Sequence, residues 1–216
     1  TEHDPYHAKA GSREYNLING AGLVKSLYFT SLYSPGIRIL PWVTYHDRNI
    51  QTRFMWFDGP NEPDAKAEQL RMLPSGCSMK FLSMHKHWEI AVDNAMADDE
   101  IVLASVQKDG LVVHAVNYGE PQSVRLRIEK LPKVFSALGQ GKVRVVKYLI
   151  DQDHSNRVAH PDYPGGIEKV GDCAVQPDNG SITLTHPRLS KNGLLLWELI
   201  PAKTGAALNA PVPLVE

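Results

Sequence analysis

The sequence predicts an α/β region over residues 1–87, an antiparallel β-sandwich over 88–204 and a tail over 205–216. Two observations carry this prediction. Apolar residues recur at helical spacing near the start of the chain. From residue 88 onward they alternate with polar residues in short runs that turn signals separate. The change of period places a domain boundary at residue 88, in a chain long enough for one large or two small domains.

The first region is predicted to contain a helix, a strand and further helices. A helix of about four turns is indicated by the spacing of Leu17, Ala21, Val24, Tyr28 and Leu32, and "SPG" at 34–36 ends it. The elements expected after it are a strand over 37–45 that contains Pro41, a second short strand over 53–57, and helices over 65–73 and 77–87. Asp64 and Ser75 precede these two helices as plausible N-caps.

The second region is predicted to form seven or eight short strands. Alternating or apolar runs occupy 88–94, 100–106, 111–118, 123–129, 143–150, 181–186 and 194–200. Turn signals separate several of them, including "KDG" at 108–110, "NYG" at 117–119 and "DNG" at 178–180. Short strands joined by hairpin turns are typical of an antiparallel β-sandwich. The tail is small and rich in proline, so no element is expected there.

Composition excludes several classes of function. The net charge is −1 at pH 7 and the pI is about 6.7, so there is no basic stripe for nucleic acid. No apolar run approaches the roughly 18 residues needed to span a membrane. Cys77 and Cys173 stand far apart without a partner motif, so we expect buried free thiols rather than a disulfide framework. There is no initiator Met and no charged leader before an apolar run, so we expect the numbering to start inside a longer gene product or after a cleavage.

Three short motifs occur in an order that matches a known enzyme family. The chain opens with "TE" in Thr1-Glu2, continues after the first helix with "WVTYHD" at 42–47, and later contains "YLIDQDHSN" at 148–156. This order resembles retaining glycoside hydrolases of clan A, most of all family 39, the β-xylosidase and α-iduronidase relatives. After His-Ser-Asn, however, "RVAHPDYPGG" replaces that family's Trp and Gly-Ser-Pro loop, so another clan A family, such as the agar-cleaving ones, stays open.

The resemblance implies the carboxyl-terminal part of a TIM-type (β/α)8 barrel followed by the sandwich. Thr-Glu then ends the seventh barrel strand, and the motif that begins at Trp42 ends the eighth. The other six strands and the general acid would come from a preceding segment or a separate chain. The implied activity is hydrolysis of an O-glycosidic bond of an oligo- or polysaccharide by a retaining double displacement, which needs no cofactor or metal.

Glu2 is the candidate nucleophile, because barrel enzymes place their chemistry at the carboxyl ends of strands. Trp42 is the candidate stacking platform for a sugar face, since an indole is flat and apolar. His3, Tyr45 and Asp47 are candidates for binding sugar hydroxyls. Each has an ordinary alternative: Glu2 an exposed charge on a terminal arm, Trp42 a core residue, Asp47 a turn cap.

Other polar groups carry weaker hypotheses. His3 and His7, or His85 and His87, have metal-like spacing, but Pro5 disfavours a helix between the first two and no third ligand is evident. Asp151, His154 and Asn156 follow a strand, and we expect them to stabilise a loop rather than to catalyse. Thr1 as an N-terminal nucleophile would require a layered fold that the pattern does not indicate.

"NEP" at 61–63 resembles the acid motif of barrel glycosidases, but its position is wrong for that role. Only one or two helices follow it before the sandwich, whereas the acid belongs on the fourth barrel strand, before the nucleophile. Glu62 lies in a run of turn formers and first-turn acids, which suits the start of a helix. The competing function for the whole chain is a non-catalytic carbohydrate-binding or structural β-sandwich.

Overall fold

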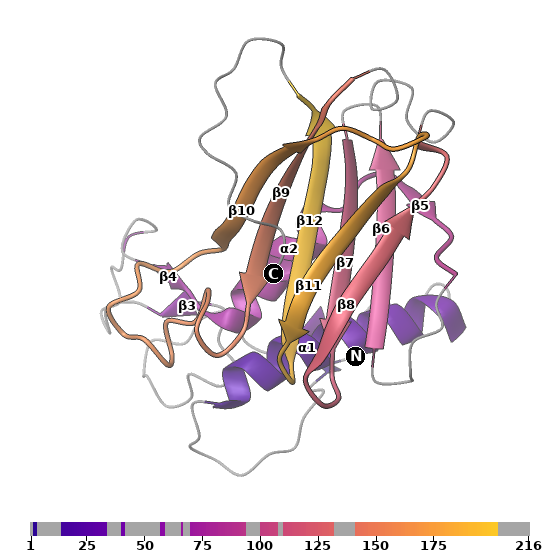
Figure 1. Ribbon diagram of the computed structural model, residues 1–216. Coiled ribbons are helices and arrows are strands. Elements are labelled where there is room, and N and C mark those ends of the chain that lie inside the picture. Colours follow the sequence, from indigo (N-terminus) through magenta and orange to yellow (C-terminus); the bar gives the residue numbers. More distant parts are fainter. Residues whose placement is uncertain are drawn as a thin grey trace.

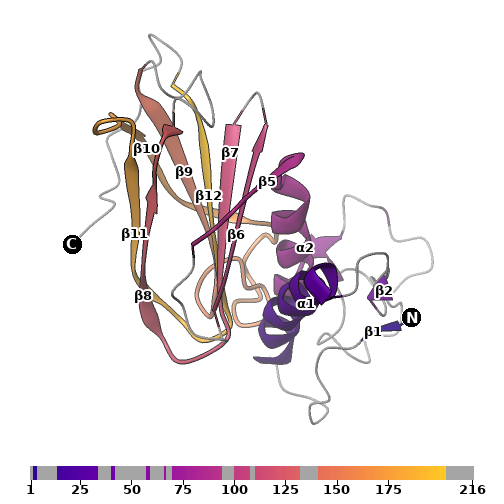
Figure 2. The ribbon, with the colours of Figure 1, turned by 90° about the vertical axis from the view of Figure 1, so that its right-hand side faces the viewer.

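A computed structural model describes residues 2–3, 14–33, 40–41, 57–58, 66, 70–93, 100–107, 110–131 and 141–202. The described elements form three layers, and Figure 2 shows them edge on. A six-stranded antiparallel sheet is in the middle, a two-stranded sheet covers one of its faces, and two helices cover the other. Among the described residues, three of the four sheets are antiparallel and one is parallel. The antiparallel sheets that form the sandwich agree with the sequence prediction.

The helices are α1 (Glu14–Tyr33) and α2 (Pro74–Met84) (Figure 1). The strands of the first region are β1 (Glu2–His3), β2 (Leu40–Pro41), β3 (Phe57–Asp58) and β4 (Arg71–Met72). The sandwich strands are β5 (Trp88–Ile90), β6 (Glu100–Gln107), β7 (Gly110–Asn117), β8 (Gln122–Ile128), β9 (Val143–Ile150), β10 (Glu168–Val175), β11 (Ile182–Leu189) and β12 (Gly193–Pro201).

The large sheet has the order β10-β9-β12-β7-β6-β5, and the small sheet is β11-β8. Every residue of β7 is buried, because both faces of the large sheet are covered at its centre. Successive side chains of a strand point to opposite faces, so β7 and β12 each contribute to two cores. This accounts for the nearly continuous apolar run of residues 194–200, which a one-sided strand would not need.

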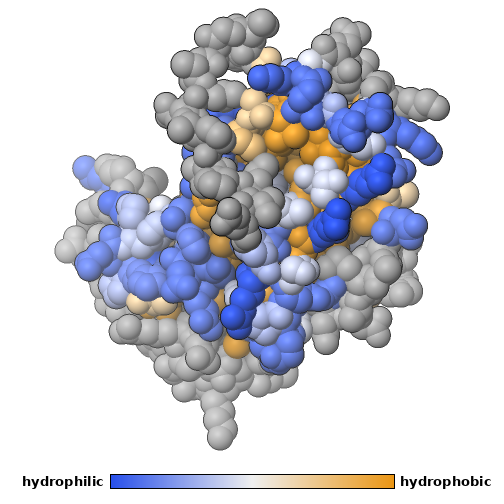
Figure 3. Space-filling model, viewed as in Figure 1, coloured by the Kyte–Doolittle hydropathy of each residue, from blue (hydrophilic) through white to orange (hydrophobic). Residues whose placement is uncertain are grey.

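The core between the two sheets is centred on Trp197, which is fully buried. Leu111, Val113 and Ala115 of β7 face this core, as do Leu195 and Leu199 of β12. Next to it, a groove of about 500 Å³ lies between β8 and the β5–β6–β7 side of the large sheet. Its walls include the aliphatic residues Ile90, Val92, Val102, Leu126 and Ile128. Figure 3 shows apolar surface exposed on this face of the molecule.

The core on the other face of the large sheet joins it to the helices. Leu17, Ala21 and Val24 of α1 and Cys77 and Phe81 of α2 pack there against Ile101, Val112, Val116, Ile150, Leu194 and Leu196. The helices also approach each other closely at Gly20, where an added Cβ would lie 3.3 Å from the Pro74 carbonyl oxygen. Helices and sheet therefore share one buried core across the predicted boundary at residue 88, and the domain division itself stays a prediction.

Several predicted elements are confirmed. Helix α1 covers the predicted apolar positions and ends one residue before "SPG". All seven predicted sandwich runs contain strands. The "DNG" turn is formed with positive φ at Asn179 and Gly180, and Asp178 and Ser181 exchange backbone hydrogen bonds across it. Of the strands predicted over 37–45 and 53–57, the described residues Leu40–Pro41 and Phe57 are in strands, and the tail lies outside the described residues.

The helix predicted over 65–73 is wrong where the structure describes that range. Arg71 and Met72 form β4, which pairs antiparallel with Phe57–Asp58. The sequence "AKAEQLRML" is made of good helix formers, but helix propensity is a weak prior that tertiary contacts override. Here Met72 is in the extended backbone of β4, and its side chain packs against the core between the helices and the sheet.

Helix α2 begins and ends earlier than predicted. Pro74 occupies the first turn, where a fixed φ and a missing N–H are tolerated, and the N-cap is Leu73 rather than Ser75. At the other end, His85 and Lys86 leave the helix and bond to one residue of β6. His85 Nδ1 lies 2.9 Å from Ser105 Oγ, and the Lys86 N–H donates to the same oxygen at 2.8 Å. These bonds explain why residues 85–87 are not helical.

Strand β10 was absent from the sequence prediction. Its sequence "EKVGDCAV" has three charged residues and a glycine, which hides the alternation. It pairs only with β9 and is an edge strand of the described sheet, where charges are common. Asp172 of β10 makes a two-pronged ion pair with Arg144 of β9, at 2.7 Å and 2.6 Å, and the Arg144 hydrogen bonds lower the pKa of Asp172 strongly.

Both cysteines are free and buried, as predicted. Cys77 lies in α2, and its Sγ is 3.1 Å from the carbonyl oxygen of Gly166. Burial raises the pKa of the Cys77 thiol to about 12, although the bond to Gly166 acts in the other direction. Cys77 is therefore a protonated donor that packs α2 against the β9–β10 connection, not a reactive thiolate.

Two histidines meet in the core between the helices and the sheet. His85 Nε2 lies 3.4 Å from Nδ1 of His114, which is fully buried in the centre of β7. Phe81 packs edge-on against the His114 ring, and His114 Nε2 has no hydrogen-bond partner among the described residues. Burial lowers the pKa of both histidines, and their mutual repulsion lowers that of His114 further.

Acid should therefore destabilise the protein, and His114→Leu should weaken this effect. The unfolded chain binds protons as the pH falls below about 6.5, while the folded chain resists protonation down to its lower pKa, so stability is lost across that window. In urea melts from pH 8 to pH 5, His114→Leu should reduce the slope by up to about one proton, or roughly 1.4 kcal/mol per pH unit.

Part of the slope should remain in His114→Leu. Burial also lowers the pKa of His186, to about 4, and His85 is still present in the variant. The matched control is His87→Leu, which removes a nearby exposed histidine instead of the buried one. An acid slope in His114→Leu equal to that of the parent would contradict a neutral buried His114.

Candidate active site

The strand that carries Glu2 and His3 lies beside the strand that leads to Trp42. Strand β1 pairs in parallel with β2, with Glu2 opposite Leu40 and His3 opposite Pro41. Helix α1 connects them, so the three elements form a strand-helix-strand unit. Figure 2 shows β1 and β2 on the side of the helices away from the sandwich. The carboxyl ends of parallel neighbours meet at one edge, and ligand sites in α/β folds lie there.

The remaining predicted sugar-binding residues cannot be placed. Trp42, Tyr45 and Asp47 lie outside the described residues, as do Thr1 and Glu62. For Glu2 and His3 the structure describes the backbone pairing alone. What the structure brings together is therefore the backbone at the ends of β1 and β2. The parts of the β2–α2 connection that it describes include β3 and β4, with Phe57 opposite Met72.

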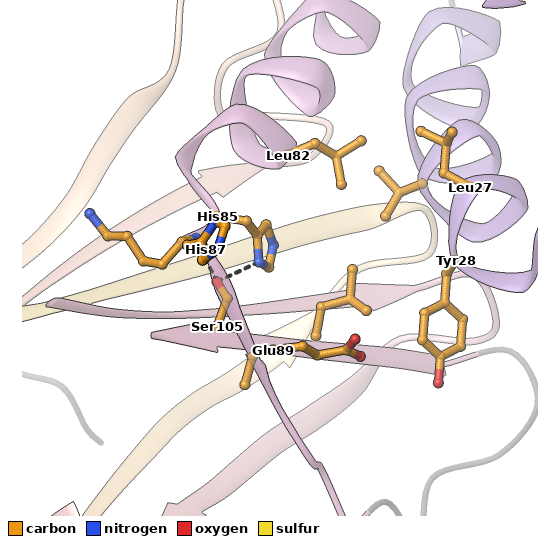
Figure 4. Close-up of a pocket in the computed structure, with 11 residues that line it drawn as sticks. Leu27, Tyr28, Leu82, His85, His87, Glu89 and Ser105 are labelled. Carbon is orange, nitrogen blue, oxygen red and sulfur yellow. Dashed lines mark hydrogen bonds between the residues drawn. The ribbon is translucent and has the colours of Figure 1, made fainter. Parts of the chain in front are cut away.

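A pocket of about 280 Å³ lies between α1, the end of α2 and strands β5 and β6. Figure 4 shows His85 and Ser105 joined by a hydrogen bond, with Tyr28 and Leu27 of α1 on the opposite wall. A Ser–His pair at 2.9 Å has the spacing of a nucleophile and its base. A serine nucleophile also needs an orienting group behind the histidine and an accessible hydroxyl.

Neither condition is met at Ser105. The nitrogen of His85 that faces away from Ser105 contacts His114, not a carboxylate. Ser105 itself is buried and accepts the Lys86 N–H. Burial also lowers the pKa of His85, which makes it a poorer base. The pair is therefore best understood as the bond that fixes the end of α2 to β6.

The aliphatic groove beside β8 offers no aromatic ring for a sugar to stack on among its described lining residues.

The Asp151 cluster stabilises a loop, as predicted. Asp151 Oδ1 accepts the N–H groups of Asp153 and His154, each at 2.8 Å, and contacts His154 Nδ1 at 2.9 Å. Asn156 donates from Nδ2 to the Asp151 carbonyl and accepts the Ala159 N–H at Oδ1. All of these partners belong to the same loop. The cluster thus satisfies the loop backbone, and its Asp151–His154 pair lies within the loop.

The described residues contain no group of three or more His, Cys, Asp or Glu side chains placed to hold a metal ion. Within the same part of the chain, neither helix combines the length and apolar character that crossing a membrane requires.

Sequence reasoning missed the His85–His114 contact. A histidine inside the apolar run "LVVHAV" was its only signal, and that signal does not identify the partner.

The comparisons with known proteins concern the fold. No family model matches the chain, and neither does any curated protein. The GH39 enzyme from Xanthomonas axonopodis pv. citri is similar with a TM-score of 0.61 and 12% identity, over 90% of this chain and 43% of that one. A GH30 subfamily 8 xylanase from Clostridium acetobutylicum has a TM-score of 0.50 and 9% identity, over 93% and 41%.

The chain thus shares its fold with part of these glycoside hydrolase structures and spans less than half of their length. The identity is low enough that the likeness concerns architecture and not residues. The match covers 90% of this chain in the first case and 93% in the second, so it extends over most of the fold.

Asp151→Ala should destabilise the chain by about 1 kcal/mol, because it removes the acceptor of the Asp153 and His154 N–H groups. Asp153→Ala is the matched control: the Asp153 side chain is 80% exposed against 14% for Asp151, and its contact with His160, among the described residues, is as long as 3.7 Å. It should change stability by less than about 0.5 kcal/mol. Equal free energies of unfolding for the two variants in chemical melts would contradict the loop role of Asp151.

Proposed function

We propose that this chain is part of a retaining glycoside hydrolase of clan A, most similar to family 39, and that Glu2 is its nucleophile. The observation that carries the proposal is the parallel pairing of β1 with β2 across α1. This arrangement suits the last two strands of a (β/α)8 barrel, whose carboxyl ends hold the reacting groups. The similarity in fold to glycoside hydrolases supports it independently.

The proposed reaction proceeds in two displacements at the anomeric carbon. Glu2 attacks that carbon and forms a glycosyl ester while a carboxylic acid protonates the departing oxygen. Water then attacks the same carbon while the second carboxyl group, now ionised, takes a proton from it; Glu2 leaves as a carboxylate and the configuration is retained. The two carboxyl groups are about 5 to 5.5 Å apart in such enzymes. In this proposal Trp42 stacks on a sugar face, and His3, Tyr45 and Asp47 bind hydroxyl groups.

The acid and the other barrel strands come, in this proposal, from a preceding segment of the gene product or a separate chain. Strands β1 and β2 pair only with each other among the described residues. Open edges of parallel strands expose backbone donors and acceptors, and closing a barrel satisfies them. The partner is therefore expected to dock against the β1–β2 side of the helices, opposite the sandwich.

Glu2→Gln in the complete enzyme should lower turnover of an aryl glycoside by several orders of magnitude and leave ligand binding nearly unchanged. The amide keeps the shape of the side chain but is not a nucleophile. The measurement is kcat for hydrolysis together with the Kd of a product sugar. Glu129→Gln is the matched control, since Glu129 is exposed at the end of β8, and it should retain full activity.

The competing function, a non-catalytic carbohydrate-binding module, makes the opposite prediction. A sugar would then bind to the chain without turnover by the complete gene product, and Glu2→Gln would change nothing. Full activity in Glu2→Gln would equally exclude Glu2 as nucleophile, because several orders of magnitude depend on that group in a double displacement.

A further inference from the structure

The connection between β9 and β10, residues 151–167, reaches out of the sandwich and contacts the first region of the chain. Figure 1 shows this connection extending to the side of the molecule where β3 and β4 lie. Val158 packs with Leu73, the residue between β4 and α2, and both are buried. The Gly166 carbonyl accepts the Cys77 thiol of α2 at 3.1 Å. The sandwich therefore touches the β2–α2 connection through this loop.

The contact is closest at Gly165. A Cβ atom on Gly165 would lie 2.9 Å from the Met72 amide nitrogen and 3.0 Å from Arg71 Cβ. Real Cβ atoms do not come so close to backbone, so only glycine permits this approach. Gly165 also has a φ of +83°, which other residues rarely adopt. The absence of a side chain at position 165 therefore allows the loop backbone to contact β4 directly.

The loop that makes this contact is held by its own hydrogen bonds. Ser155 Oγ donates to the Leu149 carbonyl at 2.6 Å and accepts the Glu168 N–H at 2.7 Å, which ties the two ends of the loop together. Arg157 Nη1 donates to the carbonyl oxygens of Pro161 and Tyr163 inside the loop. Together with the Asp151 bonds, these contacts hold the loop through residues of the loop itself and of the two strands that it joins.

We infer that the β9–β10 loop is a positioning element for the connection that follows β2, and that Gly165 is the residue that seats it on β4. The connection runs from Pro41 at the end of β2 to Pro74 at the start of α2, with β4 near its end. Connections after the strands of such units form the substrate-binding end. The inference rests on the proposed function where it concerns substrate, and the loop contact to β4 is independent of it.

The consequence is that a residue of the sandwich sets substrate affinity. If β4 moves, groups in the same connection move relative to the sugar, and small displacements cost binding and orientation. The reacting carboxylates belong to other segments and keep their positions. A loss of seating should therefore raise KM more than it lowers kcat.

The chain offers a matched pair for the test. Gly166 also has a positive φ, +101°, so Gly166→Ala likewise places a side chain in a conformation that it rarely adopts, but an added Cβ there meets nothing within 4 Å. Gly165→Ala adds the same methyl group against β4. The difference between the two variants reports the contact with β4 and not the strain of a side chain at positive φ.

The first readout is hydrogen exchange of residues 70–73 in the chain itself, which needs no substrate. Gly165→Ala should speed exchange in this segment by about tenfold, a loss of about 1.4 kcal/mol of local stability, and Gly166→Ala should leave it unchanged. Equal exchange in the two variants would overturn the inference. If Gly165→Ala does not fold, Val158→Ala replaces it, with Val170→Ala in the sandwich core as its control.

The second readout is steady-state kinetics of the complete enzyme on an aryl glycoside. KM should rise several-fold in Gly165→Ala with a smaller change in kcat, and both should match the parent in Gly166→Ala. Faster exchange at 70–73 with unchanged KM would overturn the substrate role. A complete gene product without glycosidase activity would overturn the proposed function, while the exchange experiment would still decide whether the loop seats β4.

Discussion

The structure depends on the burial of both faces of the large sheet. Strand β7 is buried at every position. In its neighbour β12, Trp197 packs in the core between the two sheets, and Leu194 and Leu196 pack in the core under the helices. Burial of apolar surface stabilises the fold by about 25 cal/mol per Å². Removal of either covering layer would therefore expose apolar surface and lower the stability of the folded chain. The small sheet and the helices are thus both required to keep the large sheet out of water.

This constraint links the candidate site to the sandwich. Helix α1 connects β1 to β2 and also packs on the large sheet through Leu17, Ala21 and Val24. The helix between the two strands in the chain is thus also part of the layer that covers the sandwich. The β9–β10 loop adds a second link, through Gly165 and Val158, to the end of the β2–α2 connection. A sandwich attached at two places can support a site that it does not itself contain.

Much of the fold could be predicted from the sequence because its signals are local. The period of α1 and the turn at Asp178-Asn179-Gly180 depend on residues close together in the chain. Strand β10 was missed because an edge strand can carry charges, and β4 was predicted as helix because its partner Phe57 is 15 residues away (57↔72). The start of α2 at Pro74 overrides the Ser75 cap that the sequence suggests.

The candidate site was predicted less completely. The loop role of Asp151 follows from its short polar side chain and was expected. Glu2 was suggested by resemblance alone, since one carboxylate near a strand end has no distinctive spacing. The contact of His85 with His114 joins residues 29 apart and depends on how α2 lies on β7, which no local pattern encodes. The contact of Gly165 with β4 also joins residues far apart in the chain, and a glycine in a loop carries no sequence signal that identifies its contact.

The central claim is that Glu2 forms a covalent bond to the sugar during turnover. The direct measurement is to incubate the complete enzyme with the 2-deoxy-2-fluoro analogue of an aryl glycoside that it hydrolyses, and to locate the adduct by peptide mass spectrometry. The fluorine slows both displacements, and a good leaving group lets the glycosyl ester accumulate. We predict a single adduct, on Glu2. An adduct on another carboxylate, or hydrolysis with inverted configuration, would contradict the account.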